Sequence, residues 1–193
     1  EPAPLLVTFH PVTLEYEQAE MQVGELLAAL EICGLPIIFT APNADTNGRV
    51  ITRMIGEFVR THSSARLVPN LDPRGYFSMM SCAAAMVGNS SSGIVEAPSF
   101  KLPVVDIGTR QKGRIRAKNV IDVDYRSADI LRGIEQATAP EFRERLHGLA
   151  NPYGDGHASD VITERLKKVD LDEQLVVKRF IDTPIFSSEG KCA

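Results

Sequence analysis

The sequence contains little of what metal sites and membrane segments require. Its three cysteines, Cys33, Cys82 and Cys192, are odd in number and lack paired zinc spacing, and no H-E-x-x-H motif occurs. Cys33 and Cys82 lie in apolar segments, which is typical of a reduced compartment. The sequence also shows no signal peptide and no run of about 18 apolar residues. We therefore expect a cytoplasmic protein with no metal and no membrane partner.

The sequence also lacks a net positive charge and has few aromatic side chains. Aromatic residues make up 6% of the 193 residues, and the formal net charge is −4. This composition excludes the basic surface with interleaved aromatics that binds nucleic acid, so we expect no nucleic-acid partner. Neither a Walker A motif nor a G-x-G-x-x-G motif occurs, and no cofactor is indicated. Function must therefore be argued from local groups of residues.

What the sequence does contain is an alternation of short apolar runs with segments of helical spacing. The runs predict strands at 5–11, 35–43, 65–70, 85–89, 103–108 and 120–124. The other segments predict helices at 14–34, 49–62, 75–84, 93–100, 127–138, 140–149 and 157–169. Strands separated by helices pair in parallel through right-handed crossovers. We therefore expect an α/β fold with a doubly wound, Rossmann-like, mostly parallel six-stranded sheet.

The predicted elements run without a linker. We expect one domain over residues 1–169, followed by a C-terminal extension and tail over 170–193. In the last helix of the domain we expect the apolar positions to face inward, namely Ala158, Val161, Ile162, Leu166 and Val169.

Polar residues follow most of the predicted strands. In an open parallel sheet, ligands bind beyond the carboxyl ends of the strands. His10 lies at the end of the first strand and Asn43 at the end of the second, and a serine cluster follows the fourth and Arg110 the fifth. We expect these groups to converge on one edge of the sheet.

The serine cluster lies in the stretch GNSSSGIVEAPSF (88–100) and allows three interpretations. Small residues and exposed N–H groups at a helix start form a phosphate cradle, here from Ser90, Ser91, Ser92 and Gly93. In that case Glu96 is placed to bind ribose hydroxyls. The alternative is a simple helix cap, with Ser92 or Gly93 as N-cap and Glu96 completing a capping box.

The third interpretation is a serine nucleophile. The run from Asn89 to Gly93 approximates the G-x-S-x-G elbow, although its first glycine is replaced and no HGGG-type oxyanion loop is present. A triad in chain order would use Ser91, an acid and a histidine. The candidates for the last two are Asp122 or Asp124 and His147 or His157.

Two further strand-end residues suit phosphate chemistry. The run RQKGRIRAK (110–118) carries five cations, of which Arg110 lies nearest the strand end and can hold phosphate oxygens in bidentate geometry. We expect most of the others to be solvated. His10 can donate to phosphate or protonate a leaving group, although a lone histidine is often structural.

Four segments together resemble the C-terminal half of the UDP-N-acetylglucosamine 2-epimerases. They are VTFHPVT (7–13), APN (41–43), MVGNSSSGIVEAPSFKLPVVDIGTRQKGR (86–114) and NPYGDG (151–156). The NSSSG form with GTRQ is similar to the hydrolysing branch, found in sialic- and legionaminic-acid synthesis. The resemblance implies two Rossmann-like domains facing each other across a cleft, as in B-type glycosyltransferases, with this chain as the C-terminal one.

The resemblance also assigns roles. His10 would contact the diphosphate and assist catalysis, Arg110 would hold the diphosphate, Glu96 would bind ribose and Asn43 would line the cleft. The phosphate would be held by Ser90, Ser91 and the amides of Ser92 and Gly93.

The implied partners are UDP or a UDP-sugar, with a GDP-sugar as the alternative, and an N-terminal domain that carries the carboxylate bases. The full-length enzyme would be a homo-oligomer. It would convert UDP-N-acetylglucosamine to N-acetylmannosamine and UDP by elimination and hydration. A B-type glycosyltransferase domain and a non-catalytic sensor remain as alternatives.

Overall fold

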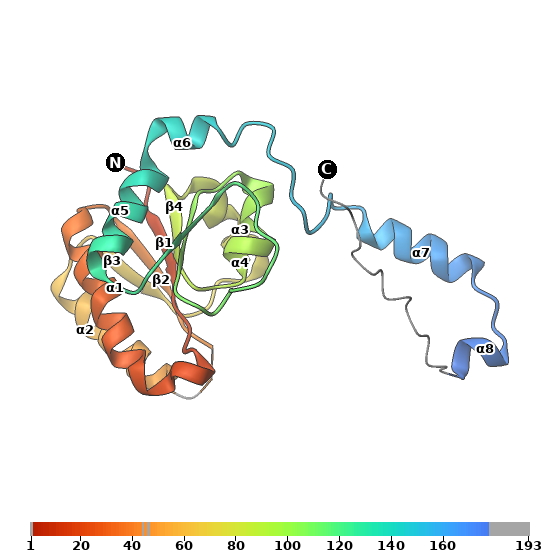
Figure 1. Cartoon of the computed structure of the whole chain (residues 1–193), viewed down its shortest axis with the longest axis horizontal. Coiled ribbons are helices and arrows are strands. Elements are labelled where there is room, and N and C mark those ends of the chain that lie inside the picture. Colours follow the sequence, from red (N-terminus) through yellow and green to blue (C-terminus); the bar gives the residue numbers. More distant parts are fainter. Residues whose placement is uncertain (1, 44, 46, 178–193) are drawn as a thin grey trace, which may run out of the picture. The chain divides into compact units, whose positions relative to one another are not determined.

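The computed structural model describes residues 2–43, 45 and 47–177, and its centre is a six-stranded sheet (Figure 1). The order of the strands is β3-β2-β1-β4-β5-β6, and every neighbouring pair is parallel. This confirms the predicted doubly wound α/β fold. The strands are β1 (Leu5–Thr8), β2 (Ile37–Thr40), β3 (Ala65–Val68), β4 (Ala85–Gly88), β5 (Val104–Ile107) and β6 (Val120–Val123).

Helices cover both faces of the sheet. One face packs against α1 (Ala19–Cys33), α2 (Gly48–Thr61) and α5 (Ser127–Thr138), whose buried side chains include Leu26, Ile55 and Ile134. The other face packs against α3 (Pro73–Cys82) and the segment of α4 (Ser92–Val95) and η2 (Ala97–Phe100). Figure 1 shows these two groups on opposite sides of the strands. Because both faces are covered, the central strands are mostly apolar on both sides, and their sequences form nearly continuous hydrophobic runs.

The start of the first predicted helix is irregular. Residues Thr13–Gln18 form the 3-10 helix η1, in which Glu15 has non-helical dihedrals, and α1 begins only at Ala19. Met21 is half exposed on this helix, and its buried residues include Gln22 and Val23. Local periodicity therefore predicted the helix but placed its start too early.

The described chain continues through α6 (Pro140–Glu144), α7 (Ala158–Lys168) and α8 (Glu173–Val176). Contacts divide it into two compact units, residues 1–155 and 156–193. The expectation that the apolar positions of α7 face inward is wrong, because none of its residues is buried. Helical spacing predicts that a helix has an apolar stripe, but it does not predict which surface covers that stripe.

The described range ends at residue 177, so most of the predicted C-terminal extension and tail (170–193) lies outside it. The domain limits at 169 and 170 stay a prediction. Along the described helices, none combines the length and apolar character that crossing a membrane requires.

Candidate functional site

The strand order reverses between β1 and β4, and a pair of hydrogen bonds joins the two strand ends there. His10 donates its backbone N–H to Asn89 Oδ1 at 2.7 Å, and Asn89 Nδ2 donates to the His10 carbonyl at 2.8 Å. Asn89 is fully buried. Gly88 has φ +135°, and a Cβ there would lie 1.9 Å from the Thr8 carbonyl oxygen. The glycine lets β4 end against β1, and Asn89 then fixes the backbone that carries His10.

The imidazole of His10 is held as a neutral group. Its Nδ1 accepts the backbone N–H of Asn43 at 3.1 Å, which leaves Nε2 to carry the proton. Burial, together with the positive charge of Arg110, lowers the pKa of His10 to about 4. At neutral pH the ring is therefore a hydrogen-bond donor through Nε2 and not a cation.

Arg110 and Gln111 anchor to the same asparagine from the end of β5. Arg110 Nη1 and Gln111 Nε2 donate to the Asn89 carbonyl at 3.1 and 2.8 Å. Gln111 is buried, and its Oε1 accepts from Arg114 Nη1 at 3.2 Å. A small cavity of about 190 Å³ is lined by Ser91, Arg110, Gln111 and Arg114. Two guanidinium groups and a serine around one polar cavity suit an anionic ligand.

The serine cluster forms the start of a short helix. The backbone N–H groups of Ser90 and Ser91 have no acceptor among the described residues, and Ser92 N–H only approaches Ser90 Oγ at 3.4 Å. Gly93 is buried against β5, where a Cβ would lie 2.7 Å from Val104. Free N–H groups are what an anion site needs, although a helix of four residues adds only a small dipole.

The capping interpretation of this stretch is wrong. The N-cap is Ser91, which makes no side-chain cap bond, and Glu96 lies at the C-terminal end of α4 instead of the N3 position. The misplacement arose because the helix begins earlier than Gly93 and ends after one turn.

The nucleophile interpretation finds no support either. Among the described residues, no hydroxyl of Ser90, Ser91 or Ser92 hydrogen-bonds to a histidine. Asp122 pairs with Arg116 at 2.8 Å, and Asp124 accepts from the next backbone N–H at 2.8 Å. A serine nucleophile requires a base within hydrogen-bond reach, and the serines lack one.

Glu96 remains available for a ligand. Its side chain is partly exposed and makes no hydrogen bond or ion pair within the described part of the chain. It follows directly after the α4 turn that carries the serine cluster. A free carboxylate beside an anion site suits the hydroxyl groups of a sugar better than the phosphate itself.

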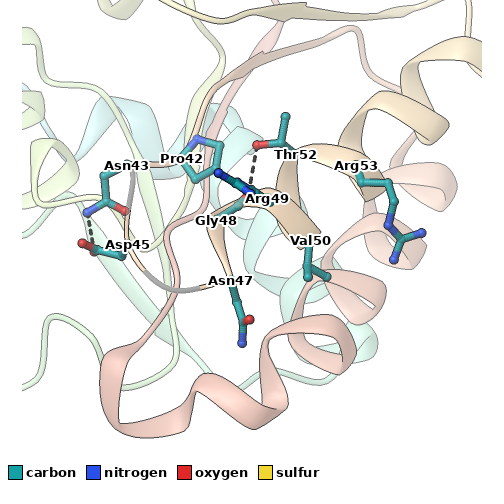
Figure 2. A pocket seen from close by; sticks show the side chains of 9 residues that line it. All are labelled: Pro42, Asn43, Asp45, Asn47, Gly48, Arg49, Val50, Thr52 and Arg53. Carbon is teal, nitrogen blue, oxygen red and sulfur yellow. Dashed lines mark hydrogen bonds between the residues drawn. The ribbon is translucent and has the colours of Figure 1, made fainter.

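Asn43 borders a larger hollow at the end of β2, shown in Figure 2. This cavity has a volume of about 880 Å³ and extends along the start of α2 to Arg53. Asn43 and Asp45 face each other, with Nδ2 donating to Oδ2 at 2.6 Å. Through its backbone bond to His10, Asn43 joins this hollow to the β1 end. His10, Asn43 and Arg110 thus belong to one connected group.

One arginine of the basic run is structural. Arg116 donates to Asp106 at 3.0 Å and to Asp122 at 2.8 Å, linking β5 to β6. Burial raises the pKa of Asp106 to about 6, even though the positive charge of Arg116 opposes the rise. Lys112 and Lys118 are exposed, as expected for solvated cations. Arg114 is exposed but borders the cavity, so two arginines of the run line it where Arg110 alone was predicted near the site.

A second network of polar side chains, centred on Glu15, lies beside the site near β6. Glu15 accepts from Thr109 Oγ1 at 2.5 Å and from Tyr125 OH and Gln22 Nε2, both at 2.7 Å. Burial opposes the charge, but these three hydrogen bonds outweigh it and lower the pKa of Glu15. Tyr125 covers Gly108, where any Cβ would clash with the phenol ring. The network fixes the loop that leads into Arg110.

Sequence reasoning missed Asn89, Gln111 and Glu15. Asn89 stands inside the serine motif, but it was counted only as a variant elbow position. An asparagine directly after a strand glycine was the available signal. Nothing local indicates that Gln111 is buried or that Glu15 reaches β5 and β6, because these contacts span more than 20 residues.

Comparison with known proteins identifies the family of this chain. The family model described as UDP-N-acetylglucosamine 2-epimerase matches residues 2–167. The GDP/UDP-N,N'-diacetylbacillosamine 2-epimerase (hydrolyzing) of Campylobacter jejuni is 39% identical over 180 residues, covering 92% of this chain and 46% of the relative. The UDP-N,N'-diacetylbacillosamine 2-epimerase (hydrolyzing) of Legionella pneumophila is 36% identical over 174 residues, covering 90% and 45%.

The fold has solved counterparts. The crystal structure of the Neisseria meningitidis UDP-GlcNAc 2-epimerase bound to UDP-GlcNAc matches with a TM-score of 0.62 and 22% identity, over 86% of this chain and 44% of that one. The chain thus spans about half the length of the relatives it matches. The match of the family model over nearly all of the sheet domain shows that the chain belongs to the UDP-N-acetylglucosamine 2-epimerase family.

Proposed function

We propose that this chain is the nucleotide-sugar-binding domain of a hydrolysing 2-epimerase that converts UDP-N-acetylglucosamine to N-acetylmannosamine and UDP. The observation that carries the proposal is the connection through Asn89, which ties His10 and Arg110 to one buried residue at the switch point of the sheet. Doubly wound sheets bind nucleotides at that point.

Different residues of the site bind different parts of the nucleotide. The free N–H groups of Ser90 and Ser91, together with the hydroxyls and amides around Ser92 and Gly93, hold phosphate oxygens. Arg110 holds the diphosphate from the other side, and Glu96 accepts hydrogen bonds from the ribose hydroxyls. Asn43 lines the wall beyond His10.

The reaction itself needs two events. A base removes the C2 proton of the sugar while the C1–O bond breaks, and the bonding electrons pass to the diphosphate. Water then adds to the resulting glycal and yields the epimer. The charge that develops on the leaving diphosphate is stabilised by donors already in place, and the neutral His10 donates Nε2–H to it.

The base belongs to the half of the enzyme that this chain does not span, according to the resemblance. We therefore expect the 193-residue chain to bind UDP and to release no N-acetylmannosamine from UDP-N-acetylglucosamine. Turnover by this chain alone would contradict the proposal. We further propose that the full-length enzyme is cytoplasmic, functions in sialic- or legionaminic-acid-type sugar synthesis and is a homo-oligomer.

Titration calorimetry with UDP and GDP tests the binding step and the choice of base. Arg110→Ala removes charge-assisted hydrogen bonds to the diphosphate, and we expect it to weaken UDP binding about 10- to 100-fold. Lys112→Ala is the matched control, because Lys112 is exposed on the same loop. Equal affinities for wild type and Arg110→Ala would contradict the assigned role.

A 2,4-diacetamido sugar is the second candidate substrate. The Campylobacter jejuni and Legionella pneumophila relatives are named as diacetylbacillosamine 2-epimerases, which favours this substrate. Assay of the full-length enzyme with each nucleotide sugar and no acceptor separates the two substrates. Dependence on an acceptor would instead indicate a B-type glycosyltransferase.

A further inference from the structure

The run NPYGDG (151–156) has no role in the proposed function, yet its first residues contact two walls of the site. Asn151 and Tyr153 belong to one tight turn. Tyr153 N–H donates to Asn151 Oδ1 at 2.9 Å, and Gly154 N–H donates to the Asn151 carbonyl at 3.3 Å. The two side chains leave this turn toward different segments.

Asn151 holds the segment that carries Glu96. Its Nδ2 donates to the Val95 carbonyl at 2.8 Å and to Ser99 Oγ at 2.8 Å. These two acceptors flank Glu96, one on the residue before it and one three residues after it. The side-chain amide thus bridges the bend between α4 and η2 on which the free carboxylate stands.

Tyr153 holds the basic loop. Its OH donates to the Ile115 carbonyl at 3.0 Å, directly after Arg114 and within the loop that Arg110 begins. Both partners are well exposed, Tyr153 at 42% and Ile115 at 66%. A hydrogen bond in water contributes little to folding stability, so its main effect is on where the loop lies.

We propose that Asn151 and Tyr153 are positioning residues. They fix the separation between the carboxylate of Glu96, which binds the ribose, and the arginines that hold the diphosphate. The proposal rests on the proposed function, because it takes Glu96 and Arg110 as ligands of one nucleotide. Two contacts on one ligand reinforce each other only when their spacing matches it. The turn is the element that sets this spacing, since it is bonded to both walls.

The test compares UDP with its parts. Dissociation constants of UDP, uridine and inorganic pyrophosphate are measured on the 193-residue chain by NMR titration, for wild type, Tyr153→Phe and Asn151→Ala. Tyr153→Phe removes only the phenol oxygen. Tyr16→Phe is the matched control, because Tyr16 OH contacts only the adjacent, exposed Glu17.

We expect Tyr153→Phe to weaken UDP binding about 3- to 10-fold, and Asn151→Ala at least as much, with uridine and pyrophosphate unchanged within about twofold. The melting temperature of Tyr153→Phe should match that of wild type. Unchanged UDP affinity in both variants overturns the inference and leaves the proposed function intact. Equal weakening of all three ligands also overturns it, because damage to a half-site would then explain the loss. If wild type binds no UDP, the proposed function fails first and the inference with it.

Discussion

The half-buried, neutral His10 makes folding stability depend on pH in a defined window. In the unfolded chain His10 has its ordinary pKa of 6.5, whereas in the folded chain the pKa is about 4. Between these values the unfolded state binds more protons, so stability is present above pH 6.5 and is lost as the pH falls toward 4. At 1.36 kcal/mol for each pKa unit, the loss reaches about 3 kcal/mol at most. Screening at the partly exposed ring reduces it.

The assay compares wild type with His10→Gln in urea unfolding at several pH values from about 7 down to about 4. Asp106 titrates in the same window, and its raised pKa acts in the opposite direction. The difference between the two proteins isolates His10, because Asp106 is common to both. We expect wild type to lose stability relative to His10→Gln as the pH falls. A constant difference across the window would refute the assignment of a buried neutral ring.

Three other substitutions test the framework of the site. Asn89→Ala should cost about 2 to 4 kcal/mol in urea unfolding, because it leaves the part-buried backbone N–H and carbonyl of His10 without their side-chain partner. A cost below about 1 kcal/mol would contradict that role. Gly88→Ala should destabilise by more than about 3 kcal/mol, since its Cβ would lie 1.9 Å from a backbone oxygen, whereas Gly24→Ala on open helix surface should stabilise by up to about 1 kcal/mol. Arg116→Met should lower the free energy of unfolding by about 3 kcal/mol, because it leaves the buried Asp106 unpaired. It should leave the affinity for UDP unchanged. A loss of affinity in a variant that is still fully folded would place Arg116 in the binding site.

The parts of the site that sequence reasoning predicted are those that follow strand ends. His10, Asn43 and Arg110 each stand after an apolar run, and the rule that ligands gather at the carboxyl edge of a parallel sheet placed them together. Their mutual contacts are now visible through Asn89 and the Asn43 backbone. Their roles toward a nucleotide stay predictions.

The predictions that failed have a common cause, because each depended on tertiary contacts that local sequence patterns do not contain. The capping box placed Glu96 in the first turn of a helix that in fact ends beside it. The apolar stripe of α7 was taken as buried, although spacing alone does not say which surface covers a stripe. Arg116 looked like its neighbours in the basic run until Asp106 and Asp122 were seen to bind it.

The sequence by itself determined the alternation of strands and helices, and hence the parallel sheet, because hydrophobic period and breaker residues act over a few neighbours. Only the tertiary structure decided which loop residues meet. The pairing of β1 with β4 brings Asn89 onto His10 across 79 positions of the chain, and the Asn151 turn reaches Val95 across 56. Such contacts depend on strand register and crossover geometry, which no local pattern encodes.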